Sequence, residues 1–192
     1  IDINEVIGAA STKPFGFTPF YPGPGLGGHC IPIDPFYLSW KAKKYGVDTK
    51  FIKLAGEVNT KMPEWVINKL TEVLVSKDKV VKKAKILILG LAYKKNIDDV
   101  RESPALKLID ILIKRGSKVM YSDPYIKEMP KTRRYNFLIK NIDLSPKNLS
   151  IFDAVILVTD HDQFNYNMIK KYSDVIIDTR ARFMKSPNVW KA

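Results

Sequence analysis

The hydrophobic pattern of this chain changes near residue 80, and the change limits the folds that it can adopt. Between residues 51 and 74, apolar residues recur at intervals of three and four, which is one face of an α-helix. Pro63 falls inside this stripe, yet the spacing stays in phase, so we predict a kinked helix or two nearly collinear helices. The stripe consists of Phe51, Leu54, Ala55, Val58, Met62, Trp65, Val66, Leu70, Val73 and Leu74.

Beyond a basic connector at 76–85, short apolar runs alternate with a helical pattern. Residues 86–89 form a continuous apolar run that ends at Gly90, as expected for a buried parallel strand. An amphipathic helix is predicted over 104–114, before Gly116. Further strands are predicted at 118–121, 154–158 and 175–177. The fold class is therefore α/β, with a central helical segment followed by a Rossmann-like, mostly parallel sheet with flanking helices.

Two domains are predicted, a central helical segment at 1–82 and a sheet domain at 83–192. Only Gly90 stands in the turn after the first predicted strand, and no G-x-G-x-x-G is present, so this turn is not expected to be a dinucleotide site. Residues 127–150 are basic, rich in Asn and weakly patterned, which predicts a surface segment. In the first domain we expect helices over 1–10 and 36–45, and a loop over 11–35.

The stretch PGPGLGGHCIPIDPFY at 22–37 contains the only cysteine, Cys30, and four of the ten glycines. Glycine allows close backbone approach, and the prolines stiffen both flanks, so the stretch predicts a rigid loop that presents a side chain. A thiol four residues before Asp34 fits a prepared nucleophile. The alternative is a small buried apolar residue. We do not expect His29 to act as its base, because adjacent side chains on an extended loop point apart.

Composition argues against several other classes of function. The net charge of +12 raises nucleic-acid binding, but the lysines are interleaved with acids and no nucleic-acid motif is present, so no such partner is predicted. No apolar run is long enough to span a membrane. One cysteine fits a reducing cytoplasm and excludes an internal disulfide framework. One cysteine and two histidines cannot complete a four-ligand zinc site without carboxylates, and no metal is predicted.

Five motifs resemble, in the same order, those of the UDP-glucose/GDP-mannose dehydrogenases. They are GPGLGGHCIPIDPFYLSWKAK, GLAYKKNIDDVRESPALKLI, YSDPY, FDAVILVTDH and VIIDTR. The family oxidises C6 of a nucleotide sugar with NAD, and the resemblance is strongest to its N-acetylhexosamine branch. It implies UDP-N-acetylglucosamine as substrate, with UDP-N-acetylmannosamine or UDP-glucose as alternatives. The family's NAD-binding domain precedes the cysteine loop, so we expect this chain to be a C-terminal portion that is inactive alone.

The resemblance also implies roles for individual residues. Cys30 would trap the aldehyde as a thiohemiacetal that becomes a thioester, and Asp34 would activate the hydrolytic water, with a helix N-cap as its alternative role. Arg101, Ile31 and Cys30 would contact NAD, although an ion pair with Asp98 or Asp99 is the alternative for Arg101. The residues expected at the UDP-sugar are Tyr21, Gly25, Leu26, Gly27, Gly28, Tyr93, Lys94, Arg180, Arg182 and Lys13, with the register at 180–182 open.

The long apolar helix at 50–75 has two interpretations. Its stripe could be intrachain core, while the resemblance implies that it forms a homodimer interface. Two other functions stay open on the sequence, a non-catalytic dimerising module that binds nucleotides and a basic nucleic-acid binder. His161, beyond a predicted strand, is interpreted as structural.

Overall fold

A computed structural model describes residues 1–192 and contains one five-stranded sheet in the order β2-β1-β3-β4-β5. Every pair of neighbouring strands is parallel, so the α/β prediction is confirmed. Chain order reverses between β1 and β3, which lie side by side, and ligands of open α/β sheets bind at such a point. The strands are β1 (Lys85–Leu89), β2 (Lys118–Ser122), β3 (Ala154–Leu157), β4 (Ile176–Asp178) and β5 (Val189–Lys191).

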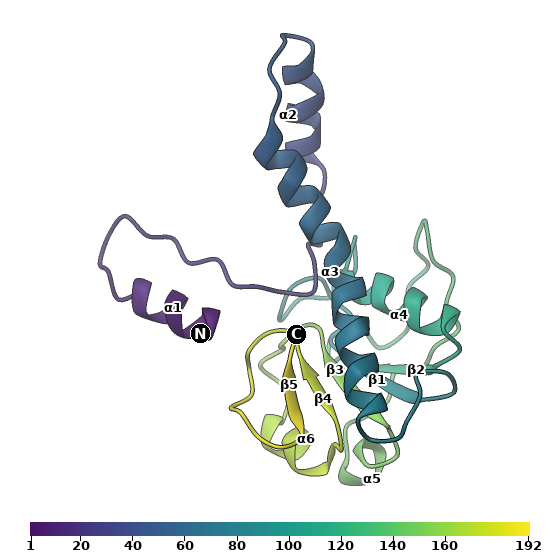
Figure 1. Ribbon diagram of the computed structural model, residues 1–192. Helices are drawn as coiled ribbons and strands as arrows, with labels where there is room; N and C mark the ends of the chain where they lie inside the picture. Colours follow the sequence, from purple (N-terminus) through teal and green to yellow (C-terminus); the bar gives the residue numbers. More distant parts are fainter.

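Six helices accompany the sheet (Figure 1). The predicted stripe forms one helix of 26 residues with Pro63 inside it. Because proline has no N–H, the Asn59 carbonyl lacks its helical donor at this point. The helices are α1 (Ile3–Ala10), α2 (Asp34–Lys43), α3 (Lys50–Val75), α4 (Pro104–Lys114), α5 (Pro146–Leu149) and α6 (Tyr166–Tyr172).

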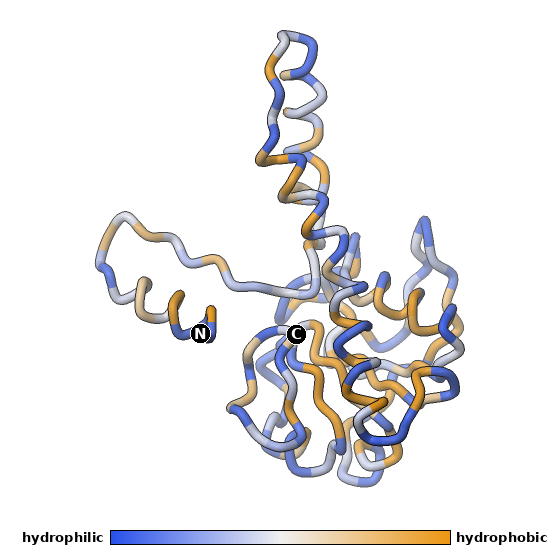
Figure 2. Tube along the Cα trace, viewed as in Figure 1, coloured by the Kyte–Doolittle hydropathy of each residue, from blue (hydrophilic) through white to orange (hydrophobic).

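The two faces of the sheet are covered by different helices. Ile86 and Ile88 of β1 pack in a cluster with α4 and the C-terminal half of α3. Leu87 and Leu89 point to the other face, where they pack in a cluster with α5 and α6. This alternation is the period of two that a strand buried on both faces requires. Along the trace, apolar residues gather on the strands (Figure 2).

Three features differ from the sequence predictions. The segment at 127–150 lies only partly on the surface, because α5 begins at Pro146 and Leu149 is fully buried. Asn141 of this segment forms an isolated bridge with Tyr121 of β2. Strand β5 and helix α6 were not predicted. Each has seven residues or fewer, too few to show a clear period.

The N-terminal half of α3 and all of α2 project away from the sheet as a helical hairpin (Figure 1). The Phe36 ring packs against Gly56 and joins the two helices. Many large apolar side chains on the hairpin and on the next turn of α3 remain exposed, among them Trp40, Phe51, Leu54, Val58 and Trp65. No helix is both long and apolar enough to cross a membrane.

Candidate functional site

The loop at 22–30 contains four glycines and ends at Cys30, and it is called the glycine loop or the cysteine loop below. It packs against the sheet domain at the start of α4. The Gly28 N–H donates to the Arg101 carbonyl oxygen at 2.9 Å. A Cβ on Gly27 would lie 2.6 Å from the Tyr93 Cβ and 3.0 Å from the Glu102 carbonyl oxygen, and one on Gly28 would meet the Tyr93 ring at 2.8 Å. Two glycines are therefore needed because Tyr93 lies directly against the backbone. The structure brings Gly27, Gly28 and Tyr93 together.

Arg180 approaches the same loop from the end of β4. Its Nε donates to the Val158 carbonyl oxygen at 2.7 Å, and a Cβ on Gly23 would lie 2.7 Å from its Nη1. Burial lowers the pKa of Arg180. Arg182 instead lies over the Tyr166 ring, with its guanidinium carbon 4.7 Å from the ring centroid. Of the two arginines considered, Arg180 is the one that lies against the glycine loop.

Cys30 is exposed, four residues before α2 begins at Asp34. The Asp34 N–H donates to the Cys30 carbonyl oxygen at 2.8 Å, which sets the two residues one helical turn apart. The N-cap position is Ile33 and no side chain caps this helix, so Asp34 does not have the capping role. His29 Nδ1 lies 3.9 Å from the Cys30 Sγ. The expectation that these side chains point apart is wrong, because the chain bends at 28–30 instead of running extended.

Arg101 is paired with Asp99, one of the alternatives considered. Its Nε and Nη2 donate to Asp99 Oδ2 at 2.9 and 2.6 Å. This interaction raises the pKa of Arg101, and the charges of Tyr93 and Cys30 add to it by smaller amounts. Conversely, the hydrogen bond from Arg101 lowers the pKa of Asp99 despite partial burial. The guanidinium thus lies within electrostatic range of the Cys30 sulfur.

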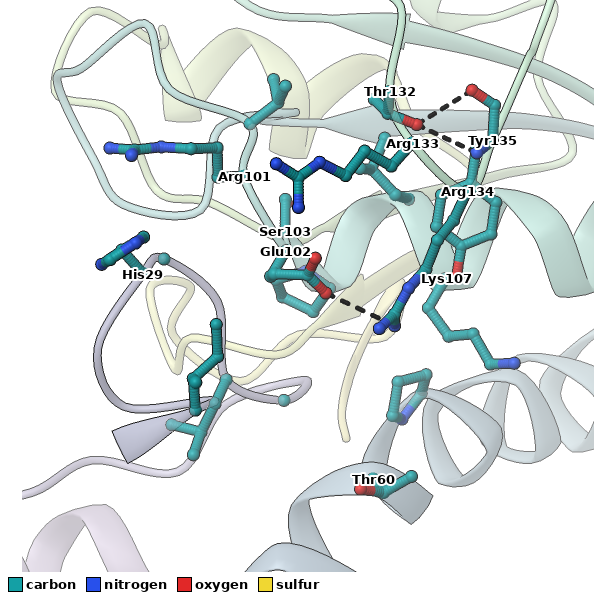
Figure 3. Close-up of a pocket in the computed structure, with 18 of the residues that line it drawn as sticks. His29, Thr60, Arg101, Glu102, Ser103, Lys107, Thr132, Arg133, Arg134 and Tyr135 are labelled. Atoms are coloured by element: carbon teal, nitrogen blue, oxygen red, sulfur yellow. Dashed lines mark hydrogen bonds and ion pairs between the residues drawn. The ribbon is translucent and has the colours of Figure 1, made fainter. Parts of the chain in front are cut away.

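A cavity of about 660 Å³ opens between the glycine loop, the middle of α3, the start of α4 and residues 131–135 (Figure 3). Arg133 and Arg134 enter from one side, and His29 lies on the other. One lining carboxylate, Glu102, pairs with Arg134 at 3.5 Å. The lining cations are Arg101, Lys107, Lys131, Arg133 and Arg134. This excess of positive charge suits an anionic ligand.

The other predicted residues are placed less centrally. Gly25 and Leu26 line the cavity, whereas Cys30 and Ile31 do not. Lys94 and Tyr21 are exposed. Lys13 lies over the Phe15 ring, in a segment that runs away from the sheet (Figure 1). No group of three or more His, Cys, Asp or Glu side chains could hold a metal ion.

Sequence reasoning missed the cations at 131–134 and Lys107. The run KTRR was visible, but its segment was read only as a surface loop. Its relation to α4 depends on how residues 123–141 fold back, which no local pattern records.

Two domain models of one protein family match this chain. Residues 87–185 match the UDP binding domain of the UDP-glucose/GDP-mannose dehydrogenase family, and residues 1–61 match its central domain. A UDP-N-acetyl-D-mannosamine dehydrogenase of Methanococcus vannielii is 33% identical over 178 residues, which cover 88% of this chain and 38% of that protein. The chain therefore spans about two fifths of the length of this relative.

Two solved structures share the fold over 100% of this chain. The UDP-D-ManNAc dehydrogenase of Pyrococcus horikoshii has a TM-score of 0.82 at 32% identity, with 44% of its own chain covered. The NDP-N-acetyl-D-galactosaminuronic acid dehydrogenase of Methanosarcina mazei has a TM-score of 0.81 at 26% identity, with 43% covered. One of these family domains matches more than half of the chain, and the other matches its N-terminal part. The chain therefore belongs to the UDP-glucose/GDP-mannose dehydrogenase family.

Proposed function

We propose that this chain supplies the nucleophile and the nucleotide-sugar site of a 6-dehydrogenase that oxidises the C6 alcohol of a UDP-N-acetylhexosamine to a carboxylate. The observation that carries the proposal is the hydrogen bond from Gly28 to Arg101, which fastens the cysteine loop to the sheet domain at the carboxyl ends of the strands. Membership of the family supports the reaction class. Arg180 and Tyr93, which contact the loop, are the residues proposed for the UDP-sugar.

Cys30 and Asp34 divide the second half of the reaction between them. The Cys30 thiolate attacks the C6 aldehyde carbon, and the new C–S bond gives a thiohemiacetal whose oxidation leaves a thioester. Asp34, one turn away, takes a proton from the water that attacks the acyl carbon. The C–S bond then breaks, which releases the carboxylate and restores the thiolate. Each of the two oxidations removes two electrons from C6, and NAD takes them up when it is bound.

The cavity beside the loop fits the diphosphate of NAD. Its five cationic side chains face one carboxylate, and phosphate is the group that arginine forks bind best. Arg101 would turn from Asp99 toward the diphosphate, which Arg133 would also contact. Ile31 and Cys30 lie outside this lining, so we propose that they meet the other end of the cofactor.

The relatives' names bear on the sugar. The Methanococcus vannielii protein is a UDP-N-acetyl-D-mannosamine dehydrogenase, as are several bacterial relatives near 32% identity. We therefore propose UDP-N-acetylmannosamine ahead of UDP-N-acetylglucosamine, which reverses the order expected from the sequence. UDP-glucose remains the third candidate.

We further propose that a second copy of the chain covers the α2–α3 hairpin. An isolated helical hairpin with two exposed tryptophans and a row of exposed apolar residues is costly to leave in water. The helical stripe at 51–65 continues the stripe that is buried in the core at 66–74, so one helix would serve both contacts.

Nucleotide binding and thiol protection test the function together. Cys30 is the only cysteine, so alkylation by iodoacetamide can be followed unambiguously by intact mass. We expect UDP-N-acetylmannosamine to slow alkylation of Cys30 and to bind measurably by calorimetry. We expect GDP-mannose to do neither. The Arg180→Ala variant should lose most UDP binding, whereas Arg182→Ala, the matched control, should keep it. Equal binding by both variants, or no protection by any UDP-sugar, would contradict the proposal.

A further inference from the structure

A buried acid–histidine pair lies at the carboxyl edge of the sheet, outside the residues assigned above. His161, after β3, is fully buried, and Asp123, after β2, is 2% exposed. His161 Nε2 lies 3.0 Å from Asp123 Oδ2. The ring of Tyr125 covers His161 with centroids 5.0 Å apart. The pair therefore has no contact with water and must satisfy its polar atoms within the protein.

Three hydrogen bonds of the pair reach the loop that follows β1, while Asp123 Oδ1 accepts from Tyr125 and Ile126 N–H. Asp123 Oδ2 accepts from the N–H groups of Leu91 at 2.6 Å and Ala92 at 3.1 Å. His161 Nδ1 accepts from the N–H of Asn96 at 2.9 Å. The loop from 91 to 96 is thus held at both of its ends. Tyr93 and Lys94 lie between these two attachments, and Tyr93 supports the glycine loop.

These contacts fix the tautomer of His161. Because the Asn96 N–H donates to Nδ1, Nδ1 carries a lone pair, so Nε2 carries the proton and donates to Asp123. Only this neutral tautomer makes both bonds. The Asn96 side chain donates to Asp162 at 2.6 Å, so the bond to Nδ1 is made by its backbone N–H alone, at a residue with φ of 62°.

We propose that His161 is a positioning residue for nucleotide-sugar binding: its Nδ1 holds Asn96, and through Asn96 it sets the shape of the loop that presents Tyr93 and Lys94. The proposal rests on the function proposed above. It assigns the two ring nitrogens different tasks. Nε2 donates a hydrogen bond to a buried carboxylate and serves stability, whereas Nδ1 holds the loop and serves binding.

Two substitutions separate these tasks. In His161→Gln the side-chain amide reaches the place of Nε2 and donates to Asp123, but the Asn96 N–H loses its acceptor. In His161→Asn the side-chain oxygen takes the place of Nδ1 and accepts from Asn96, but Asp123 loses its donor. We expect the Gln variant to bind UDP about ten-fold more weakly with the smaller loss of stability. We expect the Asn variant to bind within about three-fold of the parent with the larger loss.

The readouts are the dissociation constant of UDP by calorimetry and the free energy of unfolding in urea. A merely structural histidine would make affinity follow stability in both variants, and that result would overturn the proposal. Gln163→Ala, which removes an exposed neighbour bonded to the Tyr125 hydroxyl, is the matched control and should leave both quantities unchanged.

Amide hydrogen exchange keeps the test decisive where binding is not measurable. If the parent protein fails to bind UDP, the proposed function fails, but the positioning claim is still judged by exchange at Asn96. The Gln variant should speed exchange at Asn96 and leave Leu91 and Ala92 protected. Unchanged protection of the Asn96 N–H in the Gln variant would contradict the claim. A folded Gln variant that loses protection at Leu91 as well as at Asn96 would also contradict it.

Discussion

A single methyl group at Gly27 is enough to separate the cysteine loop from the sheet domain. The Cβ of Gly27→Ala would lie 2.6 Å from the Tyr93 Cβ and 3.0 Å from a backbone oxygen, and neither atom can swing away. We expect a loss of about 1 to 3 kcal/mol in the free energy of unfolding and faster alkylation of Cys30, as is usual for overpacking. Gly8→Ala in α1, with nothing within 4 Å, is the control and should cost nothing. A stable Gly27→Ala protein with unchanged alkylation would argue against this contact.

Asp123 should control how the protein responds to acid. Burial acts to raise its pKa, but hydrogen bonds from His161 and from backbone N–H groups outweigh burial, and the pKa lies below the ordinary 3.8. The unfolded state therefore takes up the proton first as pH falls, and the stabilisation from this carboxylate, complete above about pH 4, is lost as pH falls through the lower folded pKa.

The Asp123→Asn variant tests this. We expect about 1 to 3 kcal/mol less stability at neutral pH, since the amide cannot accept from all its backbone donors, and a flatter dependence on pH below about 4. Glu72→Gln, which removes an exposed pair with Lys69, should change stability by less than about 1 kcal/mol. Parallel pH curves for the Asn variant and the parent would exclude Asp123 as the titrating group.

At the scale of elements, we propose that α3 makes two contacts along one stripe, one with the sheet and one with a second copy. Its exposed half should join a second copy, so Leu54→Asp, at a side chain 56% exposed, should shift the protein from dimer to monomer in sedimentation velocity. Its unfolding free energy should change by less than about 0.5 kcal/mol, because no intrachain core is touched. Lys61→Glu, on the same helix, should remain dimeric. A parent protein that sediments as a monomer at every concentration would refute the dimer.

Elements were predictable where the sequence is periodic and long, or apolar and continuous. The stripe of α3 and the run at 86–89 met these conditions, and both were found. Asn165 could have predicted the start of α6, because asparagine is a favoured N-cap residue and its side chain accepts from Met168 N–H at 3.0 Å. Strand β5 had no such signal, because three residues form a strand only where β4 offers an open edge.

The cysteine loop was visible in the sequence, but its contacts with Arg180 and Tyr93 join residues more than sixty positions apart, and only folding reveals them.

At the scale of the whole molecule, the C-terminal half of α3 belongs physically to the sheet. Val66, Ile67, Leu70, Val73 and Leu74 are at most 4% exposed and lie in the core cluster of the sheet domain. Burying five such side chains contributes roughly 7 to 15 kcal/mol, as much as the whole stability of a typical domain. We therefore expect residues 83–192 alone to lack a cooperative unfolding transition and to bind a hydrophobic dye. Residues 62–192, which restore this half of the helix with Pro63 in its first turn, should unfold cooperatively in urea. Equal unfolding midpoints for the two fragments would show that the sheet does not need the helix. The predicted domain boundary at residue 82 would then also be the boundary of a unit that folds by itself.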